Sequence, residues 1–157
     1  TLGAEVDLFL KTATVFGIGI IELWAAIPAG IAFGLHPLLN GVVSALGTML
    51  GTLLVVLLGD RLRTWLIERR GPGKKREKNS RIYRIWERYG VVGLGLLAPL
   101  ITGAPLGAAI GITLGASPRR LIFWCIIGII LWAIILTLIG TLGVTAFSLL
   151  SSPAGVE

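Results

Sequence analysis

The chain has 157 residues, of which 55% are hydrophobic and only 14% are charged. Soluble domains average about 25% charged residues, so this composition excludes an ordinary soluble domain and indicates a small integral membrane protein. The formal net charge of +6 does not point to nucleic acid, because the basic residues gather in one segment beside apolar stretches.

Four stretches are long and apolar, and apart from Glu22 they carry no formal charge: 13–33, 38–58, 91–116 and 121–150. Each reaches the roughly 17–25 residues of a membrane helix. We therefore predict an all-α integral membrane protein with a single membrane domain. Its parts are an interfacial segment (1–12), a first repeat (13–59), a basic loop with a short amphipathic helix (60–89), a second repeat (90–150) and a tail (151–157).

The first apolar stretch holds a carboxylate and a proline at membrane depth. Glu22 would cost about 2.5 kcal/mol or more at the centre of a membrane helix, and Pro28 roughly 3 kcal/mol inside a helix. Two glycines follow, and His36 and Pro37 close the stretch. We predict two half-helices rather than one rod, with a functional Glu22. The alternative is a kinked helix whose Glu22 bonds neighbouring backbone or extends to the interface.

The second apolar stretch has no charge, and its small residues recur at spacings of three and four: Gly41, Ser44, Ala45, Gly47, Thr48, Gly51 and Thr52. Small residues on one face let helices approach closely. We predict an uninterrupted spanning helix with a tightly packed side.

Residues 60–88 hold 11 of the 14 basic residues and 4 of the 8 acidic ones. Such a cluster between membrane spans is typical of a cytoplasmic loop, so we place loop 60–89 in the cytoplasm of a multi-pass protein of the cell (inner) membrane. We also expect it to contact anionic lipid headgroups. Apolar residues at i, i+3, i+4 and i+7 predict a short surface helix after an N-cap at Ser80: Ile82, Ile85, Trp86 and Tyr89.

The third apolar stretch carries six glycines from Gly93 to Gly115 and two internal prolines, whereas the fourth is uninterrupted. Each half is thus a broken segment followed by a span. Two motifs recur between the halves at equal spacing. Pro28-x-Gly30-x-x-x-Gly34 of the first half recurs as Pro105-x-Gly107-x-x-x-Gly111 in the second. Gly34-x-x-Pro37 recurs as Gly115-x-x-Pro118, four residues further along the chain than the first match would place it. Repeated halves with discontinuous segments point to a transporter site at the repeat interface.

The positive-inside rule favours re-entrant hairpins over four full crossings. If each broken segment returns to the side of the membrane where it began, the halves are inverted repeats. Arg119 and Arg120 then lie on the cytoplasmic side with the other basic residues. Non-helical backbone at membrane depth must be surrounded by protein or a water cavity, so the two tips should meet. We assign the tips to six residues: Pro28, Gly30, Pro99, Gly103, Pro105 and Gly107.

The segment Glu22-Leu23-x-x-Ala26-Ile27-Pro28-x-Gly30-Ile31 resembles the opening signature of the small multidrug export protein family, and Pro99-x-x-Thr102-Gly103-Ala104-x-x-Gly107 resembles its second signature. Trp24 stands where the family usually has arginine, and Pro105 where it usually has an aromatic residue. The chain is also similar to the DedA or SNARE-associated (VTT) superfamily. That similarity implies inverted hairpins and lipid-carrier or proton-coupled transport, with an acidic residue at Glu22 and an arginine at Arg119 or Arg120.

The leading hypothesis is a small membrane transporter or lipid-carrier translocase with a polar site between the hairpins. Desolvation favours the neutral form of Glu22, so this carboxylate would couple to protons or bind a cation. Arg119 and Arg120 would attract an anionic group, His36 would relay protons and Thr102 would supply a hydroxyl. The alternatives are topological anchoring for the arginines, an interfacial role for His36 and a backbone bond for Thr102.

A scaffold or assembly factor acting through the basic loop is the alternative function. An enzyme is not expected, because the chain has one histidine, one cysteine (Cys125) and one intramembrane carboxylate. We expect no cofactor and no metal. The expected partners are membrane lipids, a small-molecule or anionic lipid substrate and a second copy in a homodimer, since four apolar elements enclose little interior; nucleic acid is not among them.

Overall fold

The computed structural model describes residues 2–59, 61 and 81–151. This part of the chain forms six helices and no strand: α1 (Leu2–Ile21), α2 (Leu23–Ala32), α3 (Pro37–Leu57), α5 (Arg81–Ile101), α6 (Ala104–Thr113) and α7 (Pro118–Ser151). The predicted N-cap Ser80 and most of loop 60–89 lie outside the described residues. An all-helical architecture is therefore confirmed for the described ranges.

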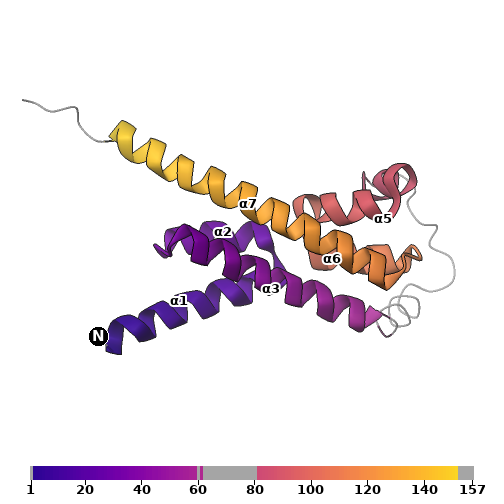
Figure 1. The fold of residues 1–157 in the computed structure, drawn as a ribbon, viewed down its shortest axis with the longest axis horizontal. Helices are drawn as coiled ribbons and strands as arrows, with labels where there is room; N and C mark the ends of the chain where they lie inside the picture. The colour runs from indigo at the N-terminus through magenta and orange to yellow at the C-terminus, as the bar shows by residue number, and fades with distance from the viewer. Residues whose placement is uncertain (1, 60, 62–80, 152–157) are drawn as a thin grey trace, which may run out of the picture.

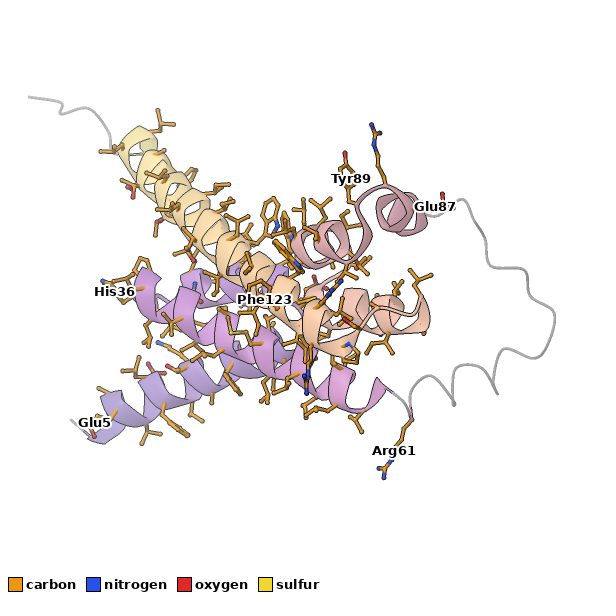
Figure 2. All side chains as sticks on the ribbon, turned by 45° about the vertical axis from the view of Figure 1, so that its right-hand side comes forward. Glu5, His36, Arg61, Glu87, Tyr89 and Phe123 are labelled. Carbon is orange, nitrogen blue, oxygen red and sulfur yellow. The ribbon has the colours of Figure 1, made fainter. Side chains whose placement is uncertain are left out.

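Each half contains an interrupted helix pair followed by an uninterrupted helix. In the first half α2 folds back along α1, so that Glu5 and His36 lie at the same end of the molecule (Figure 2). Helix α3 then runs to the opposite end, where Arg61 lies (Figure 2). In the second half α5 and α6 form a similar pair, and α7 runs back through the bundle (Figure 1).

Two helices in the described part are long and apolar enough to cross a membrane, Pro37–Leu57 and Pro118–Leu150. Helices α2 and α6 are apolar but only 10 residues long. At 1.5 Å per residue each spans about 15 Å, roughly half of a bilayer core. The apolar helices α2 and α6 therefore have about half the length of a bilayer crossing, whereas α3 and α7 reach the full length.

The corners that follow α2 and α6 have the same backbone structure. Both helices end in a residue with αR backbone angles, and the next residue is a glycine with positive φ, 71° at Gly34 and 91° at Gly115. The amide of Leu35 donates to the Gly30 carbonyl at 3.0 Å, and that of Ala116 to the Gly111 carbonyl at 2.9 Å. This bond is the 6→1 bond of a Schellman C-cap. In both halves a proline then opens the long helix.

These corners decide the register of the internal repeat. A single shift of 81 residues superposes Gly30, Gly34 and Pro37 on Gly111, Gly115 and Pro118. The sequence match of Pro28 to Pro105 implied a different shift, and the structure gives these prolines different environments. Pro28 lies inside α2, whereas Pro105 lies in the first turn of α6, where a missing N–H costs nothing. The backbone requirements of the two C-caps therefore set the register of the repeat, whereas Pro28 and Pro105 are not equivalent positions.

The helices are packed together by small residues and by an apolar cluster. Gly47 and Gly51 of α3 lie directly against the backbone carbonyls of Phe16 and Ile20 in α1, which confirms the predicted tightly packed side. Around α5, α6 and α7 the buried residues are mainly aliphatic: Leu94, Ala98, Ala108, Ile112, Ala116, Leu121 and Cys125, with Val56 of α3. Side chains facing away from these contacts are apolar and exposed along α3 and α7.

Helix α5 contains a sharp kink at Gly90, where φ is 59° and ψ is −144°. The helical segment before the kink ends at Tyr89, which is where the sequence predicts the end of a short surface helix. Glu87, Arg88 and Tyr89 are exposed, and Glu87 and Tyr89 lie toward the end of the molecule opposite His36 (Figure 2). The kink thus separates a polar, exposed segment from the apolar part of α5.

Candidate functional site

The two helix breaks meet in the interior of the fold, at Glu22 and Gly103. The Glu22 Oε1 and Oε2 atoms lie 3.3 and 3.4 Å from the position that a β-carbon on Gly103 would occupy. They are the nearest side-chain atoms to that position. The structure therefore brings the break at Glu22 against the break at Gly103.

Each break follows from the local backbone. Glu22 is extended, with φ −153° and ψ 119°, and it separates α1 from α2. Gly103 has φ 81° and ψ 144°, a backbone conformation that is strongly unfavourable for any residue other than glycine. Beyond each break the chain re-enters a helix in the same way: the amide of Ala26 donates to the Glu22 carbonyl at 3.2 Å and that of Gly107 to the Gly103 carbonyl at 3.0 Å.

The meeting point is electrostatically distinctive, because α2 and α6 both begin there. Neither N-cap residue caps its own helix with a side-chain hydrogen bond. The positive ends of two helix dipoles favour negative charge nearby, and Glu22 supplies the one carboxylate at this point. Among the described residues no donor forms a hydrogen bond or ion pair with the half-buried Glu22 side chain.

Thr102 is the second predicted site residue at this point. Its half-buried hydroxyl lies 3.5 Å from the carbonyl of Gly103, which is the outer limit of a hydrogen bond. A hydroxyl so weakly bound to its own backbone can turn toward another acceptor beside the break. The backbone bond named as the alternative is therefore present only in a weak form.

The structure does not bring His36, Arg119 or Arg120 to the Glu22 carboxylate. His36 is exposed at the start of α3, one α2 length (about 15 Å) from the break. The two arginines are exposed in the first turn of α7, at the far end of α6 from Gly103. These residues lie at opposite ends of the described structure, so they do not form one site with Glu22.

The remaining predicted tip residues lie on either side of the breaks. Pro105 is in the first turn of α6, and Gly107 packs against Ala98. Pro99 is buried within α5, three residues before Thr102. In the first half the break comes six residues before Pro28, which is exposed within α2, and Gly30 packs against the Asn40 side chain. Of the six tip residues, Gly103 is the one at a helix break.

A column of four buried polar side chains lies on the face of α3 that meets α1 and α2, and three of the four were predicted only as small residues of a packed face. The column consists of Asn40, Ser44, Thr48 and Thr52, exposed by 0–2%. Asn40 donates to the Ile27 carbonyl at 2.8 Å and Thr48 to the Gly19 carbonyl at 2.7 Å. Their recurrence at every fourth position is visible in the sequence and was the available signal.

The comparisons with known proteins place this chain in a family. No curated protein and no solved structure matched it. A family model described as "Putative small multi-drug export protein" matches residues 22–135, which begin at Glu22 and include both breaks. That description names an export protein, which is in general a membrane transporter. The chain belongs to the small multidrug export protein family.

Proposed function

We propose that the chain is a small proton-coupled membrane transporter or lipid-carrier translocase, with its polar site at the meeting of Glu22 and Gly103. The observation that carries this proposal is the carboxylate placed against a second helix break, between two helix N-termini. Discontinuous helices with their termini facing the membrane interior are a recurrent way of building transport sites.

In this proposal the helix pairs α1–α2 and α5–α6 are re-entrant hairpins that enter from opposite sides, and the halves are inverted repeats. Three observations support it. The two short helices have half-bilayer length, the corners share one cap structure under a single register, and the pairs point toward each other in the bundle (Figure 1). The resemblance to the DedA or VTT superfamily would imply the same arrangement.

The proposed orientation places loop 60–89 and the start of α7 in the cytoplasm of a cell-membrane protein. Arg61 lies at this end of the molecule and Glu5 at the other (Figure 2), and Arg119 and Arg120 lie in the first turn of α7. The excess of basic residues at one end fits the positive-inside rule. We assign the arginines to anchoring and to attraction of anionic lipid headgroups, because they lie far from Glu22.

The proposed mechanism uses the two protonation states of Glu22. When charged, the carboxylate is stabilised by the N-terminal end of α6. When protonated, it is neutral and costs less to move past apolar surfaces. Alternation between these states would couple proton movement to substrate movement. A small molecule and an anionic lipid are the two substrate classes considered.

The test is Glu22→Gln in proteoliposomes with an imposed proton gradient and a trapped pH-sensitive dye. Two probes are used, a fluorescent anionic lipid and a fluorescent lipophilic cation. We expect loss of coupled movement of whichever probe the wild type carries, with normal insertion, because the amide is isosteric and uncharged. Glu5→Gln is the matched control, since Glu5 is exposed in the first turn of α1, and it should retain activity. Wild-type transport by Glu22→Gln would refute the proposal.

A further inference from the structure

The break at Glu22 leaves a backbone carbonyl without its helical partner. In a continuous helix the carbonyl of Gly19 would accept the amide of Leu23, four residues on. Because Glu22 is extended, Leu23 begins a new helix, and the last helical bond of α1 is the one from the Glu22 amide to Ile18 at 2.8 Å. A buried carbonyl in this position needs another donor.

Thr48 of α3 supplies that donor. Its hydroxyl lies 2.7 Å from the Gly19 carbonyl and 2.9 Å from the Ser44 carbonyl of its own helix. Thr48 is fully buried and Gly19 is buried. On either side of Thr48, Gly47 and Gly51 lie against the carbonyls of Phe16 and Ile20. The last turn of α1 is therefore seated on this part of α3.

The second half shows that this position in the fold does not require a hydroxyl for packing. Under the shift of 81 residues, Thr48 corresponds to Ile129 and Gly19 to Leu100. Ile129 is also fully buried, but it has no donor to offer to a carbonyl. The hydroxyl therefore occurs in the half whose break carries the carboxylate.

We infer that Thr48 is a positioning residue for Glu22. By fixing the Gly19 carbonyl, three residues before Glu22, it sets where α1 ends and thus where the carboxylate projects toward Gly103. Its effect on transport rests on the proposed function, whereas its effect on the geometry of the break does not. The two effects can therefore be measured separately.

The experiment compares three variants in lipid. Thr48→Val keeps the shape and removes the hydroxyl, and Thr48→Ser keeps the hydroxyl. Thr52→Val is the matched control, because Thr52 is 2% exposed on the same face of α3 and, among the residues that the structure describes, its hydroxyl bonds only the Thr48 carbonyl, at 2.8 Å. Hydrogen exchange is followed in the peptide that spans residues 18–26, and coupled transport is followed with the probe that the wild type carries.

We expect exchange around Glu22 and Leu23 to rise on the order of tenfold in Thr48→Val, as for the loss of a buried hydrogen bond. It should stay unchanged in Thr52→Val. Transport should fall in Thr48→Val and return in Thr48→Ser. Equal exchange in Thr48→Val and Thr52→Val would overturn the inference, and so would undiminished transport by Thr48→Val where Glu22→Gln is inactive. If Glu22→Gln transports normally, the proposed function fails, and exchange alone decides whether Thr48 holds the break.

Discussion

The two halves of this molecule share a backbone plan but differ in what holds their long helices in place. Along α3 the buried face carries Asn40, Ser44, Thr48 and Thr52, whereas the same positions of α7 carry Leu121, Cys125, Ile129 and Ala133. All eight side chains are at least 95% buried. The buried face of α3 is therefore polar, with Asn40 and Thr48 bonding backbone carbonyls of α2 and α1, whereas the same face of α7 is apolar.

This difference shows that the repeat can be packed without polar side chains at these four positions. The apolar face of α7 packs equally closely, with Leu121 against Gly111 where Asn40 lies against Gly30. In the second half one indole supplements these contacts, since the Trp132 Nε1–H donates to the Leu96 carbonyl at 2.8 Å. On the polar face of α3, Thr48 binds the Gly19 carbonyl beside the break at Glu22, and Asn40 binds the Ile27 carbonyl of α2.

The largest expected effect comes from placing the polar residue in the apolar half. Leu121→Asn would bury an amide among Leu94, Ala98 and Cys125 and would also lose aliphatic contacts. We expect a loss of about 3 kcal/mol or more in the free energy of unfolding, measured by reversible unfolding in detergent micelles. A loss below about 1 kcal/mol would mean that α7 can supply partners for an amide, and the contrast between the halves would disappear.

Close backbone approach should be equally important in both halves. Gly51→Ala would press a methyl group against the Ile20 carbonyl, and Gly128→Ala would do the same at the Gly95 carbonyl. We expect each to cost about 1–3 kcal/mol through overpacking in the same unfolding measurement. Gly17→Ala is the control, since no atom lies within 4 Å of its added methyl. A control as destabilised as the other two would show that helix packing is not the cause.

The converse exchange, Asn40→Leu, should cost less than Leu121→Asn. It removes the bond to the Ile27 carbonyl but replaces an amide with an aliphatic group in an equally buried position. We expect a loss of about 1–2 kcal/mol, together with faster hydrogen exchange near Ile27. A cost equal to that of Leu121→Asn would indicate that shape, rather than hydrogen bonding, distinguishes the two faces.

The smallest and most symmetric effect is expected at the two repeated corners. Gly34 and Gly115 have positive φ, and nothing lies within 4 Å of a β-carbon at either position. Alanine should therefore cost only backbone strain, roughly 1 kcal/mol at each. Thermal unfolding midpoints of Gly34→Ala and Gly115→Ala should drop by similar amounts. A clear difference between them would contradict the equivalence of the two corners.

The sequence alone determined the membrane character, the interruption of both halves and the position of the corners. Long apolar stretches limit the chain to helices in lipid, and Gly34, Pro37, Gly115 and Pro118 meet local backbone demands that depend little on the rest of the fold. For the same reason the end of the short surface helix at Tyr89 could be predicted, since Gly90 interrupts it. Glu22 could be selected because a charge within an apolar stretch is costly.

Only the tertiary structure decided where the first helix breaks and which residues meet there. Pro28 strongly disfavours a continuous helix in isolation, yet α2 continues through it while the chain breaks at Glu22. At that break the end of α1 contacts Thr48 and two glycines of α3. The contact between Glu22 and Gly103 joins residues 81 positions apart. Such a contact depends on how two hairpins pack against α3 and α7, and no local pattern in either half contains that information.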